Sequence, residues 1–370
     1  MGFKVYEYSA EQGQYGKEMV TLLIEKKDLI TQMPGLYAVT EVTLDGQTFY
    51  AAASENRGGK VFIVNPQTKL ATELYGGKGG VMAILDVKGE NAILFIEEFY
   101  PVFDSATAKV IKAEIQNTEN GYVVTKRTVL AEIPYVHRIA FLTEADGIYL
   151  AAGKLCKHKD NQDDWSTSGT MEIGKYDPSE EKIEMKQIYD GVTKHHAMFV
   201  SKDSNGNDDL FFGGTEGTFR AHYLHGEWKV DQILDVPTSD IVYVDLDGDG
   251  KKELAIIEEF HGNQVTVFKE INGYMERMVE IPIEFGHVLW GGEFLGHTSL
   301  LIGSRAGDKA LRKVTFLCDE DGGTRIDETV ILDEGQAPAQ IFVTGTPKET
   351  IVVAANHGAA KMTEYVCTTK

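Results

Sequence analysis

The chain has 370 residues, of which 42% are hydrophobic, and its formal net charge is -21. An acidic excess of this size repels phosphate backbones, so we expect no nucleic-acid partner. Cys156, Cys318 and Cys367 are too few and too widely spaced for a disulfide framework or a zinc ribbon. No apolar run approaches the roughly 18 residues that span a bilayer, and no signal peptide is visible at the N-terminus. We therefore expect a cytoplasmic protein with no membrane partner.

Short runs rich in Val, Ile, Phe and Tyr recur along the chain between Gly, Asp and Asn, which is typical of β-strands. One type of apolar strand returns every 40 to 60 residues or so, and we interpret it as the first strand of a repeating sheet. The predicted first strands are 36–42, 81–87, 138–144, 197–203, 241–247, 288–294 and 339–345. This period predicts an all-β fold, a seven-bladed β-propeller of four-stranded antiparallel blades. A pair of β-sandwiches is the competing fold.

The two ends of the chain are predicted to meet in one blade. The last repeat supplies about three strands, whereas residues 1–30 have strand character and no first strand before them. We therefore expect residues 1–30 to complete the last blade and close the ring, so that residues 1–370 form a single domain without open sheet edges. Blade three carries a long insertion, 155–169, and blade two a shorter one within 97–109. Such loops often cover a binding site.

An acidic loop follows the fifth first strand. Asp245, Asp247, Asp249 and Glu253 stand at positions 1, 3, 5 and 9, with glycines between them. Oxygen ligands at this spacing suit Ca²⁺. The motif resembles the loop of FG-GAP propeller repeats, and a shorter copy stands at 203–210. The resemblance implies a structural Ca²⁺ on the face opposite the active site, and an ordinary Asp/Gly turn without metal is the alternative.

Polar residues stand directly before several first strands. His137, His196, His287 and Asp240 occupy this place in four of the seven repeats, and Gly35, Gly80 and Pro338 in the others. First strands line the channel of a propeller, so these side chains are predicted to meet at one mouth. A single histidine at a strand start is usually structural, but three at equivalent places predict a site.

A second set of polar residues follows the second strand of each repeat, where a glycine lets the chain turn away. This set contains Arg57, Glu216, His261 and His357, and Arg305 and Lys154 stand at similar points. We expect both sets to converge on the same mouth. His137, His196 and His287 are the predicted ligands of a divalent transition metal, Zn²⁺, Mn²⁺, Fe²⁺ or Ni²⁺.

These residue types suit removal of a proton next to a carbonyl or carboxylate, followed by loss of an oxygen substituent. His261 is the predicted base, Arg57 the anion clamp, and Glu216 and His357 are candidate acid or orienting groups. Arg305, Lys154 and Asp240 are predicted to bind substrate. The predicted blade pattern, the FG-GAP-like loop and the channel-mouth histidines together resemble propeller lyases of uronic-acid saccharides. They also resemble the propeller part of aldos-2-ulose and anhydrofructose dehydratases. The resemblance implies a metal-dependent carbon–oxygen lyase whose substrate is a small sugar, a keto-sugar or an oligosaccharide.

Other functions use the same residues. A keto-sugar isomerase or epimerase needs the same apparatus as a lyase. A hydrolase needs two carboxylates, for which Glu216 and Glu259 are candidates. The protein could instead be a non-catalytic propeller that serves as a binding scaffold, and such a scaffold needs no metal at the channel mouth. The oligomeric state is not predicted.

Overall fold

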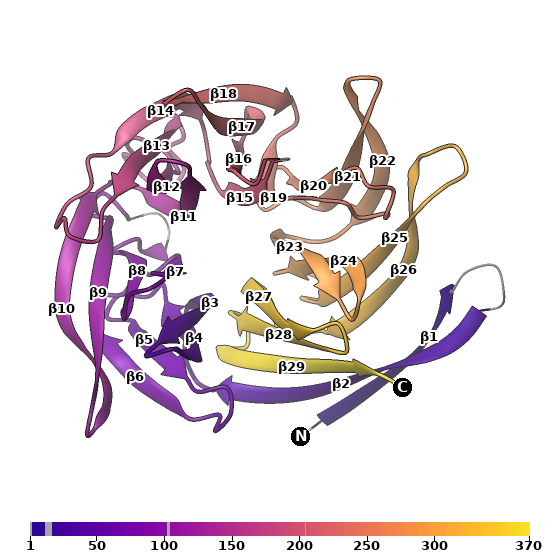
Figure 1. The fold of residues 1–370 in the computed structure, drawn as a ribbon, viewed down its shortest axis with the longest axis horizontal. Coiled ribbons are helices and arrows are strands. Elements are labelled where there is room, and N and C mark those ends of the chain that lie inside the picture. The colour runs from indigo at the N-terminus through magenta and orange to yellow at the C-terminus, as the bar shows by residue number, and fades with distance from the viewer. Residues whose placement is uncertain (1, 12–16, 102–103, 204) are drawn as a thin grey trace.

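The computed structural model describes residues 2–11, 17–101, 104–203 and 205–370. It contains seven antiparallel sheets arranged as the blades of a propeller around one axis. The first strand of each blade lies nearest the axis and the fourth lies at the rim (Figure 1). This confirms the predicted all-β, seven-bladed fold. Among the described residues, no helix is long and apolar enough to cross a membrane.

Six blades are consecutive four-stranded meanders. Blade 1 contains β3 (Leu36–Leu44), β4 (Gln47–Ser54), β5 (Lys60–Val64) and β6 (Ala71–Gly76). Blade 2 contains β7 (Ile84–Asp86), β8 (Ala92–Glu97), β9 (Lys109–Thr118) and β10 (Gly121–Glu132). Blade 3 contains β11 (Val136–Glu144), β12 (Gly147–Lys154), β13 (Gly169–Tyr176) and β14 (Lys186–Val192).

The second half of the ring repeats this order. Blade 4 contains β15 (Ala197–Lys202), β16 (Asp208–Gly214), β17 (Gly217–Leu224) and β18 (Glu227–Leu234). Blade 5 contains β19 (Thr238–Val244), β20 (Glu253–Glu258), β21 (Gln264–Ile271) and β22 (Tyr274–Pro282). Blade 6 contains β23 (Gly286–Phe294), β24 (His297–Ser304), β25 (Leu311–Cys318) and β26 (Thr324–Asp333).

Blade 7 joins the two ends of the chain. It contains β27 (Pro338–Thr346), β28 (Glu349–Asn356), β29 (Lys361–Thr369), β2 (Lys17–Ile30) and β1 (Gly2–Glu11). Strand β2 pairs with β29 from Leu22↔Thr369 to Ile30↔Met362, and β1 pairs with the outer side of β2. The N-terminal segment therefore completes the last blade, as predicted, and adds a fifth strand to it.

The hydrophobic core is divided into layers between neighbouring blades. Leu142 and Ile173 of blade 3 pack with Leu210 and Phe212 of blade 4, and six comparable clusters of buried side chains fill the other interfaces. Each sheet is apolar on both faces, so it buries both only when it has a neighbour on each side. Closure of the ring supplies that neighbour to every blade.

Candidate functional site at the channel mouth

A bulge marks the start of most first strands. In β3, β11, β19, β23 and β27 the pairing with the second strand skips one residue. The skipped residues are Tyr37, His137, Ser239, His287 and Ala339. A bulge redirects the side chain of the extra residue. His196 directly precedes β15 and occupies the equivalent place in blade 4.

This ring differs in part from the predicted one. His137, His196 and His287 stand where the sequence placed them. In blades 1, 5 and 7, however, the ring residues are Tyr37, Ser239 and Ala339, not Gly35, Asp240 and Pro338. The sequence alignment was therefore off by two residues in blade 1 and by one residue in blades 5 and 7, because the position of a bulge depends on the pairing of two strands.

The ring residues surround a cavity of about 140 Å³ at one end of the channel. Four imidazoles and two phenols lie in its wall together with apolar side chains, one carboxylate and one guanidinium. The lining residues are Tyr37, Glu55, Met82, Phe99, Tyr100, Pro101, His137, His196, His261, His287 and Arg305.

Three of the imidazoles are close enough to share one metal ion. One ring nitrogen from each of His196, His261 and His287 lies within 4.8 Å of the others. Nδ1 of His196 lies 2.8 Å from the main-chain oxygen of Ser239, and Nδ1 of His287 lies 2.8 Å from that of Ala339. A carbonyl only accepts hydrogen bonds, so both Nδ1 atoms carry the proton. Nε2 of both rings therefore keeps its lone pair, which is the arrangement that metal-ligating histidines use.

His261 comes from the turn after β20. Its backbone has φ 55°, and Gly262 follows because a Cβ atom there would lie 1.6 Å from the main-chain oxygen of Glu258. The imidazole is stacked between Phe260, with ring centres 4.0 Å apart, and Phe285, at 4.5 Å. Its buried Nε2 has no hydrogen-bond partner among the described residues. These contacts fix the ring and leave a nitrogen free for a ligand.

His137 lies beside His196 but does not belong to the group of three. Its ring centre is 4.5 Å from that of His196. The hydroxyl of Tyr37 lies 3.4 Å from Nε2 of His137 and 3.4 Å from Nε2 of His287. Tyr37 is only 2% exposed, and its burial raises the pKa of the phenol to about 12. The phenol therefore stays protonated, and its hydroxyl lies between two imidazoles.

The imidazoles are neutral at neutral pH. Burial lowers the pKa of His137, His196 and His287 well below the ordinary value of 6.5. Burial also lowers the pKa of His261 to about 3, and the charge of Arg305 adds to this effect. Neutral imidazole is the form that binds metal, because the lone pair is not taken by a proton.

A charged network forms part of the cavity wall. Nη2 of Arg305 lies 2.9 Å from Nδ1 of His357, and Nε2 of His357 lies 2.7 Å from Oε1 of Glu55. Since the guanidinium can only donate, Nδ1 accepts and Nε2 donates to the carboxylate. His357 therefore holds Arg305 in place and does not itself line the cavity.

The other predicted site residues lie away from the cavity wall. The side chain of Arg57 is 63% exposed, pairs with Asp104 and lies 3.8 Å over the ring of Tyr100. Oε2 of Glu216 accepts a hydrogen bond from the main-chain nitrogen of Thr193, at 2.6 Å. Thus Arg57 reaches the site only through Tyr100, and Glu216 supports a loop.

Two further predicted residues have structural contacts. Nζ of Lys154 lies 3.4 Å from Oε1 of Glu172 in the next strand of the same blade. Oδ2 of Asp240 accepts a hydrogen bond from the main-chain nitrogen of Leu289, in blade 6, at 2.8 Å. Asp240, which directly follows the ring residue Ser239, therefore links blade 5 to blade 6.

The insertion of blade 3 contacts the site indirectly, through Phe260. Trp165 packs edge-on against Phe260, with ring centres 5.8 Å apart. Nζ of Lys159 lies 3.3 Å over Trp165, and Nζ of Lys194 lies 5.3 Å over the same ring. Because Phe260 is stacked on His261, one aromatic ring separates the insertion from the histidines, and no residue of the insertion lines the cavity.

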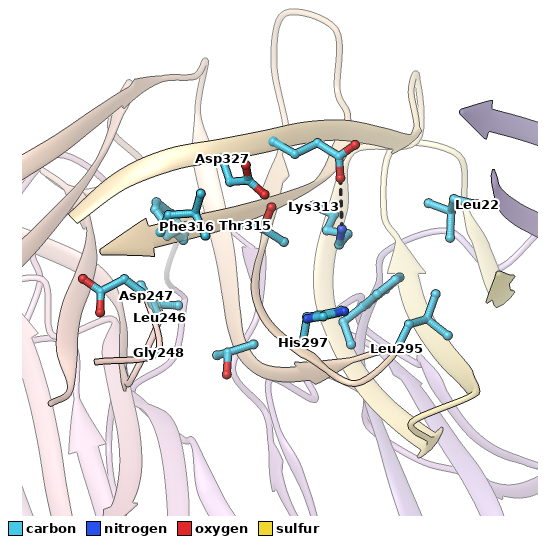
Figure 2. Close-up of a pocket in the computed structure, with 14 residues that line it drawn as sticks. Leu22, Leu246, Asp247, Gly248, Leu295, His297, Lys313, Thr315, Phe316 and Asp327 are labelled. Atoms are coloured by element: carbon cyan, nitrogen blue, oxygen red, sulfur yellow. Dashed lines mark hydrogen bonds and ion pairs between the residues drawn. The ribbon is translucent and has the colours of Figure 1, made fainter. Parts of the chain in front are cut away.

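A second cavity, of about 230 Å³, lies beside the predicted cation loop between blades 5, 6 and 7. Figure 2 shows Asp247 and Gly248 at one end of it and Leu22 at the other, with His297 and Lys313 between them. Nζ of Lys313 pairs with Glu328 at 3.4 Å. This cavity contains none of the channel-mouth residues.

Tyr37, Glu55 and Phe260 were missed by sequence reasoning. The place of Tyr37 in the ring follows from the bulge in the pairing of β3 with β4, and none of these three residues has a signal in the sequence alone. No protein-family model matches the chain, and no curated protein sequence matches it.

Proposed function

We propose that the channel mouth holds a divalent transition metal and that the protein is a carbon–oxygen lyase acting on a small sugar acid or keto-sugar. The observation that carries this proposal is the group of three neutral imidazoles, His196, His261 and His287, within 4.8 Å of one another in a small cavity. Three-histidine sites with an open position are typical of catalytic metals. Imidazole ligands favour Zn²⁺, Fe²⁺ or Ni²⁺ over Ca²⁺ or Mg²⁺.

The ligand set in this proposal differs from the sequence-based one. His261 replaces His137, because His261 belongs to the close group and His137 does not. His137 becomes the base, since its Nε2 faces the phenol of Tyr37 and its buried Nδ1 finds no partner within the described part of the chain. Tyr37 becomes the proton donor to the departing oxygen.

In the proposed reaction, a proton leaves the carbon next to a carbonyl or carboxylate and is taken by His137. The electron pair of that C–H bond forms a C=C bond, and the oxygen substituent on the next carbon departs with its bonding pair and takes a proton from Tyr37. His196, His261 and His287 would hold the divalent metal, which would supply Lewis-acid stabilisation of the developing enolate charge.

Arg305 is the proposed anion-binding residue. It lines the cavity, and His357 fixes one of its nitrogens while the planar group keeps other donors for a ligand. A guanidinium binds a carboxylate in two parallel hydrogen bonds, which suits a sugar acid. Arg57, the clamp predicted from the sequence, is exposed and paired with Asp104.

The test is elemental analysis of the purified protein combined with an assay for unsaturated products. We expect stoichiometric transition metal, and a new ultraviolet band when uronides or keto-sugars are added. His196→Ala abolishes both, and His222→Ala, a substitution on outer strand β17, changes neither. A protein that purifies without transition metal and takes up none on addition contradicts the proposal and favours the binding scaffold.

A further inference from the structure

The acidic loop between β19 and β20 has its own cation. Nζ of Lys269, from the neighbouring strand β21, lies 2.6 Å from Oδ2 of Asp247 and 2.9 Å from Oδ2 of Asp249. It also lies 3.4 Å from Oε1 of Glu253. These carboxylates are the third, fifth and ninth positions of the predicted Ca²⁺ loop. The side chain of Lys269 is 1% exposed, so its ammonium is enclosed by them.

The remaining oxygens of the loop are occupied by the main chain. Asp245 accepts from the nitrogens of Gly248, at 2.8 Å, and Gly250, at 3.0 Å, one on each of its oxygens. Oε2 of Glu253 accepts from the nitrogen of Leu246 at 2.7 Å. The first ligand position therefore stabilises the turn, although its oxygens lie within 4.8 Å of those of Asp247 and Glu253.

A further contact fixes Asp247 toward the ammonium. The hydroxyl of Thr324, on β26 of blade 6, donates to Oδ2 of Asp247 at 2.6 Å. The same oxygen thus receives hydrogen bonds from two different blades. Asp247 itself is buried, with its side chain 0% exposed.

This arrangement does not fit the Ca²⁺ that the FG-GAP resemblance implies. Ca²⁺ needs six to eight oxygens at about 2.3–2.6 Å, and an ammonium that lies within 3.4 Å of three of the four carboxylates occupies the place where those oxygens converge. We propose that Lys269 replaces Ca²⁺ in this loop, so that blade 5 is cross-linked by a built-in cation and needs no metal. The ammonium group can take the place of Ca²⁺ because it is a compact positive charge with three hydrogen-bond donors.

A Ca²⁺ ion from the solvent has a short path to the acidic loop. Asp247 and Gly248 form one end of the second cavity (Figure 2), so the loop borders a space that reaches the surface. A shorter, neutral side chain at position 269 leaves converging carboxylates beside that space. We therefore expect Lys269→Met to convert the loop into a Ca²⁺ site, whereas Lys251→Met, which removes an exposed charge from the same loop, does not.

The experiment compares thermal unfolding and calcium titration of the full chain, Lys269→Met and Lys251→Met in chelator and in millimolar CaCl₂. For the wild type and Lys251→Met we expect no Ca²⁺-dependent change in Tm and no calorimetric binding at the loop. For Lys269→Met we expect a lower Tm in chelator and a rise of about 3 °C when Ca²⁺ exceeds its Kd about a hundredfold.

Two results overturn the proposal. One is stoichiometric Ca²⁺ binding by the wild type that Asp245→Asn removes, because Lys269 then does not replace the ion. The other is a folded Lys269→Met that binds no Ca²⁺. If Lys269→Met does not fold with or without Ca²⁺, the wild-type titration decides alone. A transition metal at the channel mouth leaves all these results unchanged, since the two sites share no residue.

Discussion

Nδ1 of His196 in blade 4 lies 2.8 Å from the main-chain oxygen of Ser239 in blade 5. The same relationship joins His287 in blade 6 to Ala339 in blade 7. Each imidazole is therefore oriented by the bulge of the following blade, and its tautomer is set by the backbone. Substitution of Ser239 or Ala339 by another non-proline residue keeps the carbonyl, so the orientation does not depend on those side chains.

The exchange of roles between His261 and His137 can be tested directly. We expect His261→Ala to lose bound transition metal, because it removes one of the three converging nitrogens. We expect His137→Ala to keep the metal and lose lyase activity, because it removes the proposed base. Elemental analysis and activity of the two variants, side by side, check this. Loss of metal in His137→Ala together with retention in His261→Ala restores the ligand set predicted from the sequence.

Tyr37→Phe removes a hydroxyl that contacts two histidines without changing the shape of the cavity. We expect a fall in kcat of about 10²-fold or more, because the departing oxygen loses its proton donor. The metal content should be unchanged, and Tm should change by no more than a few degrees, since the ring keeps its packing. A variant with wild-type kcat shows that the phenol has only a structural role.

Arg305 and Arg57 are a matched pair for testing anion binding. Arg305 lines the cavity and Arg57 is exposed beside it. Arg305→Gln should raise KM for a carboxylate substrate by about 10²-fold, the loss expected for a charge-assisted hydrogen-bond pair. Arg57→Gln should change KM less than about threefold. Steady-state kinetics on both variants measure this, and equal effects argue that the substrate binds outside the cavity.

Glu144 provides a pH-dependent prediction that involves neither the channel mouth nor the acidic loop of blade 5. It lies at the end of β11, and its burial, with the nearby Asp208 and Asp203, raises its pKa to about 7 even though Lys202 opposes the shift. Its Oε1 lacks a hydrogen-bond partner in the described residues. Above pH 7 the folded protein holds an unfavourable carboxylate, and the penalty disappears as pH falls toward the unfolded value of 4.5.

Glu144→Gln should therefore raise Tm at pH 8 and have little effect at pH 5. The difference in unfolding free energy between the two variants should change by at most about 1.4 kcal/mol per pH unit within this window. Glu119→Gln, in an exposed turn, is the control and should show no such dependence. A benefit of Glu144→Gln that is larger at pH 5 contradicts the prediction.

Asp240 contributes to stability through the link between blades 5 and 6. In Asp240→Leu the buried main-chain nitrogen of Leu289 loses its acceptor, which should cost about 1–3 kcal/mol. Asp240→Asn keeps an oxygen at the same place and should cost less. Chemical denaturation of both variants tests this, and equal losses would show that the charge of Asp240 matters more than its hydrogen bond.

The fold was predictable because each blade repeats the same strand signal. All seven first strands were found, although the second, predicted at 81–87, is limited to β7 (Ile84–Asp86). The main-chain nitrogens of Glu98 and Phe99 donate to the oxygens of Gly79 and Gly80, at 2.9 and 3.1 Å, so the chain enters this blade as an irregular segment held by long-range contacts. That contact spans about twenty residues and has no local signal.

The site was predictable where a side chain itself carries the chemistry. Histidines before three first strands pointed to the channel mouth, and His261 was found by its place before a glycine. Tyr37 was missed because the alignment placed Gly35, two residues earlier, in the ring, and the bulge that presents Tyr37 depends on the pairing of two strands. Lys269 was missed because its strand is apolar and alternating, and only the sheet places it beside the acidic loop.

Closure of blade 7 by β2 and β29 has a consequence for synthesis. Strand β2 leaves the ribosome early, yet its partner is made more than three hundred residues later. Throughout that time β2 has an open hydrogen-bonding edge, which invites pairing with other nascent chains. The imidazoles of the channel mouth are positioned by contacts from blades 4 to 7, so they are ordered only after blade 7 has formed. A chain whose synthesis stops before β29 would therefore lack both the closed ring and the channel-mouth site.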